Sequence, residues 1–145
     1  MTQSQQMHKD KTAGRPEGYW ISDDKPRPEL FDAEAQAEAG KWSKIKTAQV
    51  RRFFGQVMAD KRHFDLRKGT EDPSADSDAC VAMAMLKATS AYAAARDSKR
   101  QPLADFVAHH ANLVKSLQDF SLFARHFEAV VAWHKVFESQ KPRRS

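Results

Sequence analysis

The stretch that decides the fold is Ile45–Lys61, IKTAQVRRFFGQVMADK. Its apolar side chains recur at positions 50, 53, 54, 57 and 58, which is the spacing of one face of an amphipathic helix. Gln49, Arg52 and Gln56 lie on the opposite face, and Arg51 lies at its edge. The sequence therefore predicts a helix that buries one side in a core and presents a polar, cationic side to a partner or to solvent.

The segments after residue 100 carry two further amphipathic stripes. Pro102 suits the first turn of a helix, and apolar residues follow it at helical spacing up to Leu117. A second stripe runs from Phe120 to Phe137, with Asp119 as its expected N-cap. We expect these two helices to pack against each other through their apolar faces.

Residues 79–95, ACVAMAMLKATSAYAAA, are apolar on nearly every side. Such a pattern predicts a central, buried helix, in which Cys80 is a small buried apolar residue. Sustained period-two alternation is absent from the sequence, so we expect no sheet.

These patterns predict an all-α fold, a compact bundle of five or six helices over residues 41–139. Residues 140–145 form a basic C-terminal tail. Residues 1–40 are rich in Gly, Pro and acidic side chains and suggest a disordered or loosely docked tail, with a possible short helix that ends at Gly40. Tyr19-Trp20-Ile21 is a short apolar patch in this tail that suits docking on the core or on a partner.

The charge of the chain is unevenly distributed. The net charge is +5 over 145 residues, with a pI near 9.4. Residues 41–68 carry nine basic and two acidic groups, and acidic segments lie on both sides of them. A local basic stripe is typical of a protein that binds a polyanion, and it is equally typical of a solvated surface.

The residue types needed for catalysis are not arranged in familiar motifs. The single cysteine excludes an intramolecular disulfide and a zinc knuckle, and a free thiol suits a reducing cytoplasm. The sequence contains no HExxH, no Gly-rich phosphate loop and no GxSxG. The polar N-terminus indicates no signal peptide, and no apolar run approaches the ~20 residues of a membrane span. We therefore expect a cytoplasmic, non-enzymatic protein with no cofactor or metal.

The histidines and Trp42 are assigned to the core or to the surface from their place in the apolar stripes. His110 and His134 lie on apolar stripes and are expected in the core, whereas His63, His109 and His126 look exposed. Trp42 lies among lysines, where it either stacks on a base or packs against the neighbouring segments.

Three stretches resemble one known family. They are KIKTAQVRRFF at 44–54, AMLKATSAYAAAR at 84–96 and FARHFEAVVAWHKVF at 123–137. Their order and spacing over residues 41–138 resemble the small helical subunit of type III-A CRISPR (Csm) effector complexes, although Trp133 stands where the family often has Tyr. Residues 1–40 match no motif of that family.

The resemblance implies a non-catalytic helical subunit that stacks in several copies along a guide-RNA ribonucleoprotein. Its implied partners are guide RNA, target RNA, other subunits of the complex and copies of itself, with no membrane. The matching motif positions imply RNA contacts, and two lysines are added for their charge and proximity. The candidate RNA-binding residues are Lys44, Lys46, Gln49, Arg51, Arg52 and Arg96.

Alternatives remain at two levels. Arg96 either contacts RNA or holds the end of its own helix through a carboxylate or carbonyl groups. The whole chain is alternatively a free-standing, sequence-tolerant RNA-binding protein, or a helical adaptor that binds only protein.

Overall fold

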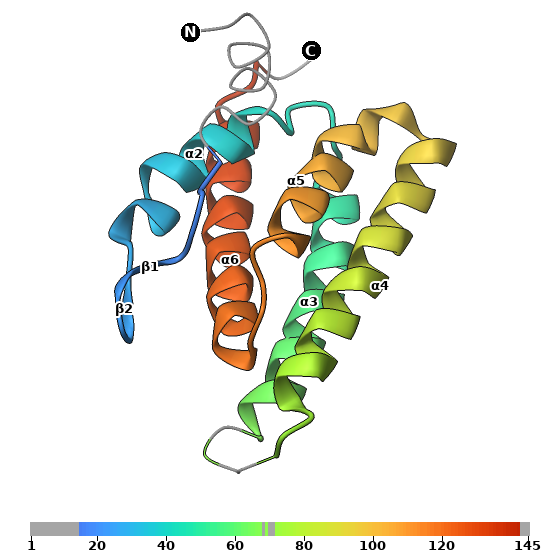
Figure 1. Ribbon diagram of the computed structural model, residues 1–145. Coiled ribbons are helices and arrows are strands. Elements are labelled where there is room, and N and C mark those ends of the chain that lie inside the picture. The colour runs from blue at the N-terminus through green and yellow to red at the C-terminus, as the bar shows by residue number, and fades with distance from the viewer. Residues whose placement is uncertain (1–14, 68, 70–71, 143–145) are drawn as a thin grey trace, which may run out of the picture.

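The computed structural model describes residues 15–67, 69 and 72–142, and the long helices in this part of the chain run up and down beside one another (Figure 1). The described residues contain five α-helices, which confirms the predicted all-α bundle. In chain order the elements are β1 (Trp20–Ser22), β2 (Lys25–Pro26), the 3-10 helix η1 (Pro28–Phe31), α2 (Ala33–Gly40), α3 (Thr47–Asp65), α4 (Ala75–Arg96), the 3-10 helix η2 (Ser98–Arg100), α5 (Gln101–Ala111) and α6 (Leu117–Ser139).

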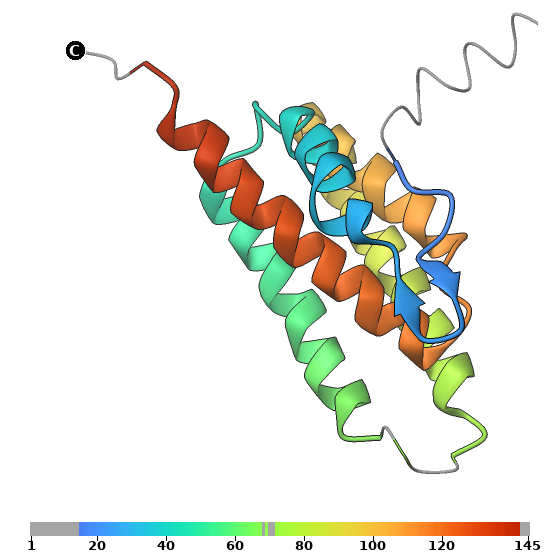
Figure 2. The ribbon, with the colours of Figure 1, turned by 90° about the vertical axis from the view of Figure 1, so that its left-hand side faces the viewer.

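Helix α6 is the centre of the bundle. Its predicted stripe is buried from Phe120 through His134, and α2 and α3 pack along it on either side (Figure 2). The expected N-cap, Asp119, is wrong: the helix begins three residues earlier, because the hydroxyl of Ser116 accepts a hydrogen bond from the Asp119 N–H at 3.0 Å. Ser116 is therefore the N-cap, a position that favours a short polar side chain.

The ring of Phe127 lies where four segments of the chain meet. Five aromatic rings have their centroids 5.4–6.0 Å from it, contributed by Trp42, Phe53, Phe54, Phe106 and Phe123. Trp42 is fully buried and donates its indole N–H to Glu38 at 2.8 Å. Trp42 therefore packs in the core and is not available to stack on a base.

Residues 15–32 dock on the core through a few buried side chains, so the expected loose attachment is wrong for this segment. Tyr19 is only 2% exposed, and its hydroxyl lies 2.6 Å from His110 Nδ1. Arg15 forms an ion pair with Glu38 at 2.8 Å, and both side chains are buried. Docking on the core, one of the two alternatives for the Tyr19-Trp20-Ile21 patch, is thus observed for Tyr19. Weak periodicity gave no sign of the Arg15 contact, because a few large side chains anchor the segment rather than a continuous stripe. The remainder of the predicted tail, residues 1–14, lies outside the described residues.

The same segment contains a small sheet that the sequence pattern did not predict. Strands β1 and β2 pair antiparallel across a turn in which Asp24 adopts a left-handed backbone, with φ of 61°. Aspartate tolerates this conformation better than most residues. Strands of two and three residues are too short to produce a detectable alternation, so the expectation of no sheet is wrong here.

Helix α4 is not the buried central helix that its apolar composition predicted. It packs mainly on α5 and forms an outer edge of the bundle (Figure 1). Its buried face consists of Ala75, Ala79, Met83, Leu86, Ser90 and Ala94. The remaining faces of α4 are exposed, Cys80 included. Composition indicated the apolar character of α4, but it did not indicate which faces of the helix the other described residues leave uncovered.

Three histidines of the described residues are buried among the helices. His110 and His134 lie in the core as expected, whereas the expectation that His126 is exposed is wrong. The His126 Nδ1–H donates to the Leu30 carbonyl oxygen at 2.5 Å. That carbonyl belongs to η1, so the docked N-terminal segment covers a position that helix α6 alone would leave open.

Candidate nucleic-acid interface

The structure confirms that the α3 helix has one apolar, buried face and a polar, cationic side. Val50 and Val57 are buried, and Phe53 and Phe54 are half-buried against Phe127. Arg51, Arg52 and Gln56 are exposed on other sides of the helix. The α3 helix therefore anchors itself through one face and leaves Arg51 and Arg52 in solvent.

The turn that enters α3 places two lysines at the surface. Ile45 is buried, and its carbonyl oxygen accepts a hydrogen bond from His134 Nε2 at 3.1 Å. Lys44 and Lys46 lie on either side of this anchor and are exposed. Burying the central residue of this tripeptide directs its two neighbours outward.

A surface pocket of about 440 Å³ joins α3 to the C-terminal end of α4. It is lined by Arg52, Tyr92, Ala93, Arg96, Asp97 and Arg100. Three guanidinium groups and a single carboxylate make this pocket cationic. The pocket brings together Arg52 and Arg96, which the sequence placed on two separate helices.

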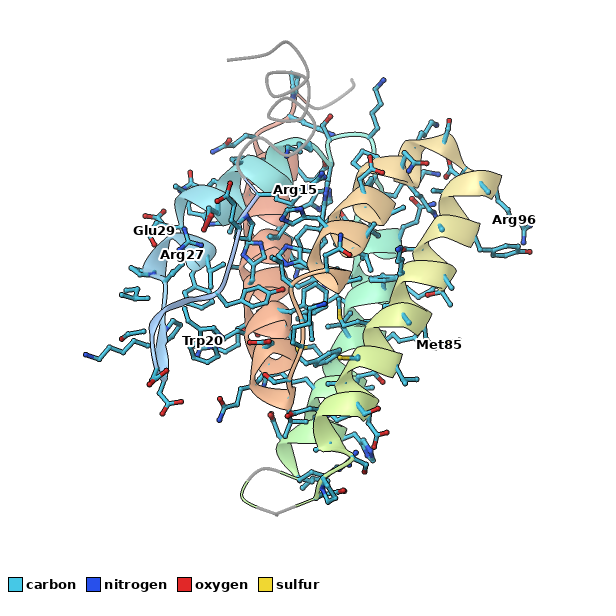
Figure 3. The ribbon with its side chains drawn as sticks, viewed as in Figure 1. Arg15, Trp20, Arg27, Glu29, Met85 and Arg96 are labelled. Atoms are coloured by element: carbon cyan, nitrogen blue, oxygen red, sulfur yellow. The ribbon has the colours of Figure 1, made fainter. Side chains whose placement is uncertain are left out.

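Arg96 lies against a tyrosine one helical turn before it. Its guanidinium carbon is 5.7 Å from the centroid of the Tyr92 ring, and its Nη1 is 3.4 Å from the Tyr92 hydroxyl. Both side chains are exposed, and Figure 3 shows Arg96 projecting from the outer side of α4. Among the described residues, the contact of Arg96 is with this ring rather than with a carboxylate or a carbonyl group. The hypothesis that Arg96 holds the helix end finds no support in these contacts.

Arg100 is positioned by a glutamine from the predicted site. With its amide oriented to suit these donors, the Gln49 side-chain oxygen accepts hydrogen bonds from Arg100 Nη2 at 2.7 Å and from Nε at 3.2 Å. Asp97 lies 3.8 Å from Arg100 Nε and also accepts from the backbone N–H of Lys99 at 3.2 Å. Gln49 and Asp97 thus fix one arginine of the pocket, while Arg52 and Arg96 stay exposed.

The structure divides the six candidate residues into two groups. Gln49, Arg52 and Arg96 gather at the pocket, whereas the others do not line it. Arg100 and Tyr92 line the pocket but were not among the candidates. The basic cluster after α4 and the tyrosine of the 84–96 motif were visible in the sequence, but only the folded chain brings them to α3. The residues outside the pocket are Lys44, Lys46 and Arg51.

A larger cavity, of about 690 Å³, lies near the opposite ends of the long helices. Its lining mixes acidic, basic and apolar residues. Its two arginines, Arg67 and Arg125, face three aspartates in the lining, and Arg67 is already engaged by Asp72 at 2.6 Å and Asp78 at 2.8 Å. This cavity is therefore a poorer candidate for a polyanion than the smaller arginine pocket, despite its size.

Residues 15–67, 69 and 72–142 contain no group of three or more His, Cys, Asp or Glu residues arranged to hold a metal ion. The same residues form no helix that is both long and apolar enough to span a membrane.

A family model described as Csm2 Type III-A matches residues 25–140. The chain belongs to the Csm2 family. Searches of curated proteins and of solved structures found no match. Csm2 proteins are structural, non-catalytic subunits of type III-A CRISPR complexes, so membership of a type III-A effector complex with other subunits follows for this chain. The family match begins within β2, so it includes part of the N-terminal segment that carried no recognisable motif.

Proposed function

We propose that this Csm2 chain contacts the backbone of guide or target RNA through the arginine pocket, as a stacked, non-catalytic subunit of a cytoplasmic type III-A complex. The observation that supports this most directly is the convergence of Arg52, Arg96 and Arg100 on one pocket. Lys44, Lys46 and Arg51 extend the basic surface along α3 and its entry turn.

The chemistry of the pocket suits phosphate groups. A guanidinium presents several N–H donors in a planar arrangement that matches phosphate oxygens. Three such groups against one carboxylate leave a net positive charge. Phosphate contacts carry no sequence information, which suits a complex in which base pairing between guide and target selects the sequence.

The salt dependence of RNA binding tests this function. For single-stranded RNA, the slope of log K against log salt changes by about 0.7 for each phosphate neutralised. Replacing Arg52 and Arg96 with alanine should therefore reduce the slope by about 1.4 if each contacts one phosphate. Binding should weaken to a similar degree for unrelated RNA sequences. The measurement is RNA binding across a salt series, by the isolated chain and by the assembled complex.

The matched control removes the same charge elsewhere. Arg62→Ala/Lys115→Ala also removes two exposed cations, but neither residue lines the pocket. This control should change the slope much less than the pocket variant. Equal slopes for both variants would show that overall charge, not the pocket, binds RNA. An unchanged slope and affinity in the pocket variant would exclude the proposed contact. Loss of complex assembly with RNA binding intact would favour a protein adaptor.

A further inference from the structure

The three arginines of the pocket are held to different degrees. Arg100 is half-buried and donates to the Gln49 side-chain oxygen from Nη2 at 2.7 Å and from Nε at 3.2 Å. Arg52 and Arg96 are exposed, and Figure 3 shows Arg96 projecting outward from α4. Among the described residues, no carboxylate or amide oxygen pairs with either of these two side chains. Arg100 is therefore the arginine of the pocket whose guanidinium group is fixed before any ligand binds.

The contact with Gln49 occupies one edge of the Arg100 guanidinium group. The group carries five N–H donors in one plane, and the glutamine oxygen accepts from Nε and from one hydrogen of Nη2. The Asp97 carboxylate lies on the same edge, 3.8 Å from Nε. The opposite end of the group keeps Nη1 and the second Nη2 hydrogen, which form a parallel pair of donors. Such a pair matches two oxygens of one phosphate group, so Arg100 can hold a phosphate without giving up its bond to Gln49.

Gln49 does not line the pocket itself. The residues that line the pocket do not include it, and its side-chain oxygen is directed at Arg100. A neutral amide also carries no charge with which to neutralise a phosphate. The motif at 44–54 placed Gln49 among the candidate RNA-binding residues, whereas these contacts favour an indirect role.

A guanidinium group that is fixed in advance binds an anion more tightly than a mobile one. Ordering a long, flexible side chain on binding costs conformational entropy, and a side chain that is already ordered avoids that cost. For one arginine the advantage is on the order of three- to tenfold in the dissociation constant. Arg52 and Arg96 carry the same charge as Arg100, but a ligand has to order them.

We propose that Arg100 is the phosphate anchor of the pocket and that Gln49 is a positioning residue, which affects RNA binding only through Arg100. This inference rests on the RNA contact proposed above, and it gives the three arginines different roles. Arg100 fixes where a phosphate lies, whereas Arg52 and Arg96 add positive charge around it. Loss of the Gln49 amide therefore lowers the affinity for RNA but leaves the salt slope nearly unchanged, because no charge is removed.

A double-mutant cycle separates an indirect role of Gln49 from direct contact with RNA. Gln49→Met keeps the length of the side chain and removes its acceptor. It should weaken the binding of single-stranded RNA about three- to tenfold in the otherwise unchanged chain, and it should add nothing in an Arg100→Ala background. Gln56→Met is the matched control, because Gln56 is exposed on the same helix and does not line the pocket, and it should leave binding unchanged.

The dissociation constants are measured across a salt series with the full chain and with the assembled complex, and melting curves check that each variant folds. Equal losses from Gln49→Met in both backgrounds would show that Gln49 touches RNA and would overturn the proposal. Full RNA affinity in Arg100→Ala would overturn it as well. Neither outcome decides the RNA contact itself, which the salt slope of Arg52→Ala/Arg96→Ala tests separately.

Nuclear magnetic resonance of the full chain without RNA tests the positioning directly. The Arg100 Nε–H signal, identified by its loss in Arg100→Ala, should exchange with water more slowly than those of Arg52 and Arg96, because it is hydrogen-bonded. Gln49→Met should abolish this protection, and Gln49→Glu should retain it, since a carboxylate also accepts from a guanidinium group. An Arg100 signal that exchanges as fast as those of the two exposed arginines, or one that Gln49→Met leaves protected, would overturn the role of Gln49.

Discussion

Glu38 is a buried carboxylate on which three segments of the chain converge. Its oxygens accept from Arg15 Nε at 2.8 Å, from Arg15 Nη2 at 3.3 Å and from the Trp42 indole at 2.8 Å. Lys41 Nζ lies 3.9 Å away. A buried ion pair adds little net stability over an apolar pair, but removing one partner leaves a buried charge and is strongly destabilising. Through its bonds to Arg15, Glu38 therefore fixes where the N-terminal segment docks on α2.

Two buried histidines predict how stability depends on pH. Burial lowers the pKa of His110 well below its ordinary value of 6.5, and neighbouring His126, His109 and Arg15 lower it further. Burial also lowers the pKa of His126, against a smaller opposing effect of its bond to the Leu30 carbonyl. The folded chain thus holds both rings neutral at pH values where the unfolded chain protonates them.

The stability that these histidines contribute is fully present above pH 6.5 and is lost as the pH falls below it. Each histidine that protonates only on unfolding lowers the free energy of unfolding by about 1.4 kcal/mol per pH unit in that range. Chemical denaturation between pH 5 and 8 measures this slope. His126→Gln should make it shallower, whereas the exposed His63→Gln should not. A slope that His126→Gln leaves unchanged would mean that the pKa of His126 is the same in the folded and the unfolded chain, so that burial does not lower it.

At the scale of elements, α6 is the helix that the other segments cover. Its Phe120, Phe123 and Phe127 are all fully buried, and Phe127 contacts rings from the α2–α3 turn, α3 and α5. Helix α4, in contrast, contributes one narrow face to the core. The two longest described helices therefore differ in burial: α6 packs against most of the other segments, whereas most of the surface of α4 is exposed.

Truncation of Phe127 tests the central position of α6. Replacing a buried phenylalanine with alanine typically lowers the free energy of unfolding by ~3–5 kcal/mol, which for a chain of this length corresponds to a fall in melting temperature on the order of 10 °C. Thermal melting followed by circular dichroism measures the change. Phe137→Ala is the comparison on the same helix, and it should cost less because Phe137 is only half-buried. Equal losses for the two variants would contradict the described packing.

At the scale of the whole molecule, the N-terminal segment packs against helices α5 and α6 from the second half of the chain. Two further hydrogen bonds add to the Tyr19–His110 and Arg15–Glu38 contacts. The Trp20 indole N–H donates to Asp119 at 2.8 Å, and His109 Nε2 donates to the Pro16 carbonyl oxygen at 2.5 Å. These contacts join residues more than 90 positions apart in the sequence. The fold is therefore one unit from residue 15 onward rather than a bundle with an independent tail.

Deletion of residues 1–28 tests whether the N-terminal segment stabilises the helical bundle. The shortened chain loses the buried Tyr19 and Arg15, and it leaves Glu38 without its ion-pair partner. We expect its melting temperature to fall well below that of the full chain. Tyr19→Phe separates the two contributions, because it keeps the buried ring and removes only the hydroxyl bound to His110. It should cost about 1 kcal/mol. A deletion that leaves the melting temperature unchanged would show that residues 29–142 fold independently.

Sequence periodicity determined the long amphipathic helices and their inward faces. The stripes on α3 and α6 follow from side chains that recur every three to four residues, so Phe53, Phe127 and His134 could be assigned to the inner side without a structure. The motifs at 44–54, 84–96 and 123–137 also determined the family resemblance, because their order and spacing are properties of the chain itself. The cationic side of α3 followed from the same periodicity.

Only the tertiary structure decided where the separate segments meet. The arginine pocket joins Arg52 to Arg96 and Arg100 across more than forty residues of sequence, and no local pattern specifies such a contact. The burial of Tyr19 and His126 and the exposure of Met85 were decided in the same way. Periodicity reports which sides of a helix are apolar, but burial depends on whether another segment covers them. That depends on contacts between residues far apart in the chain.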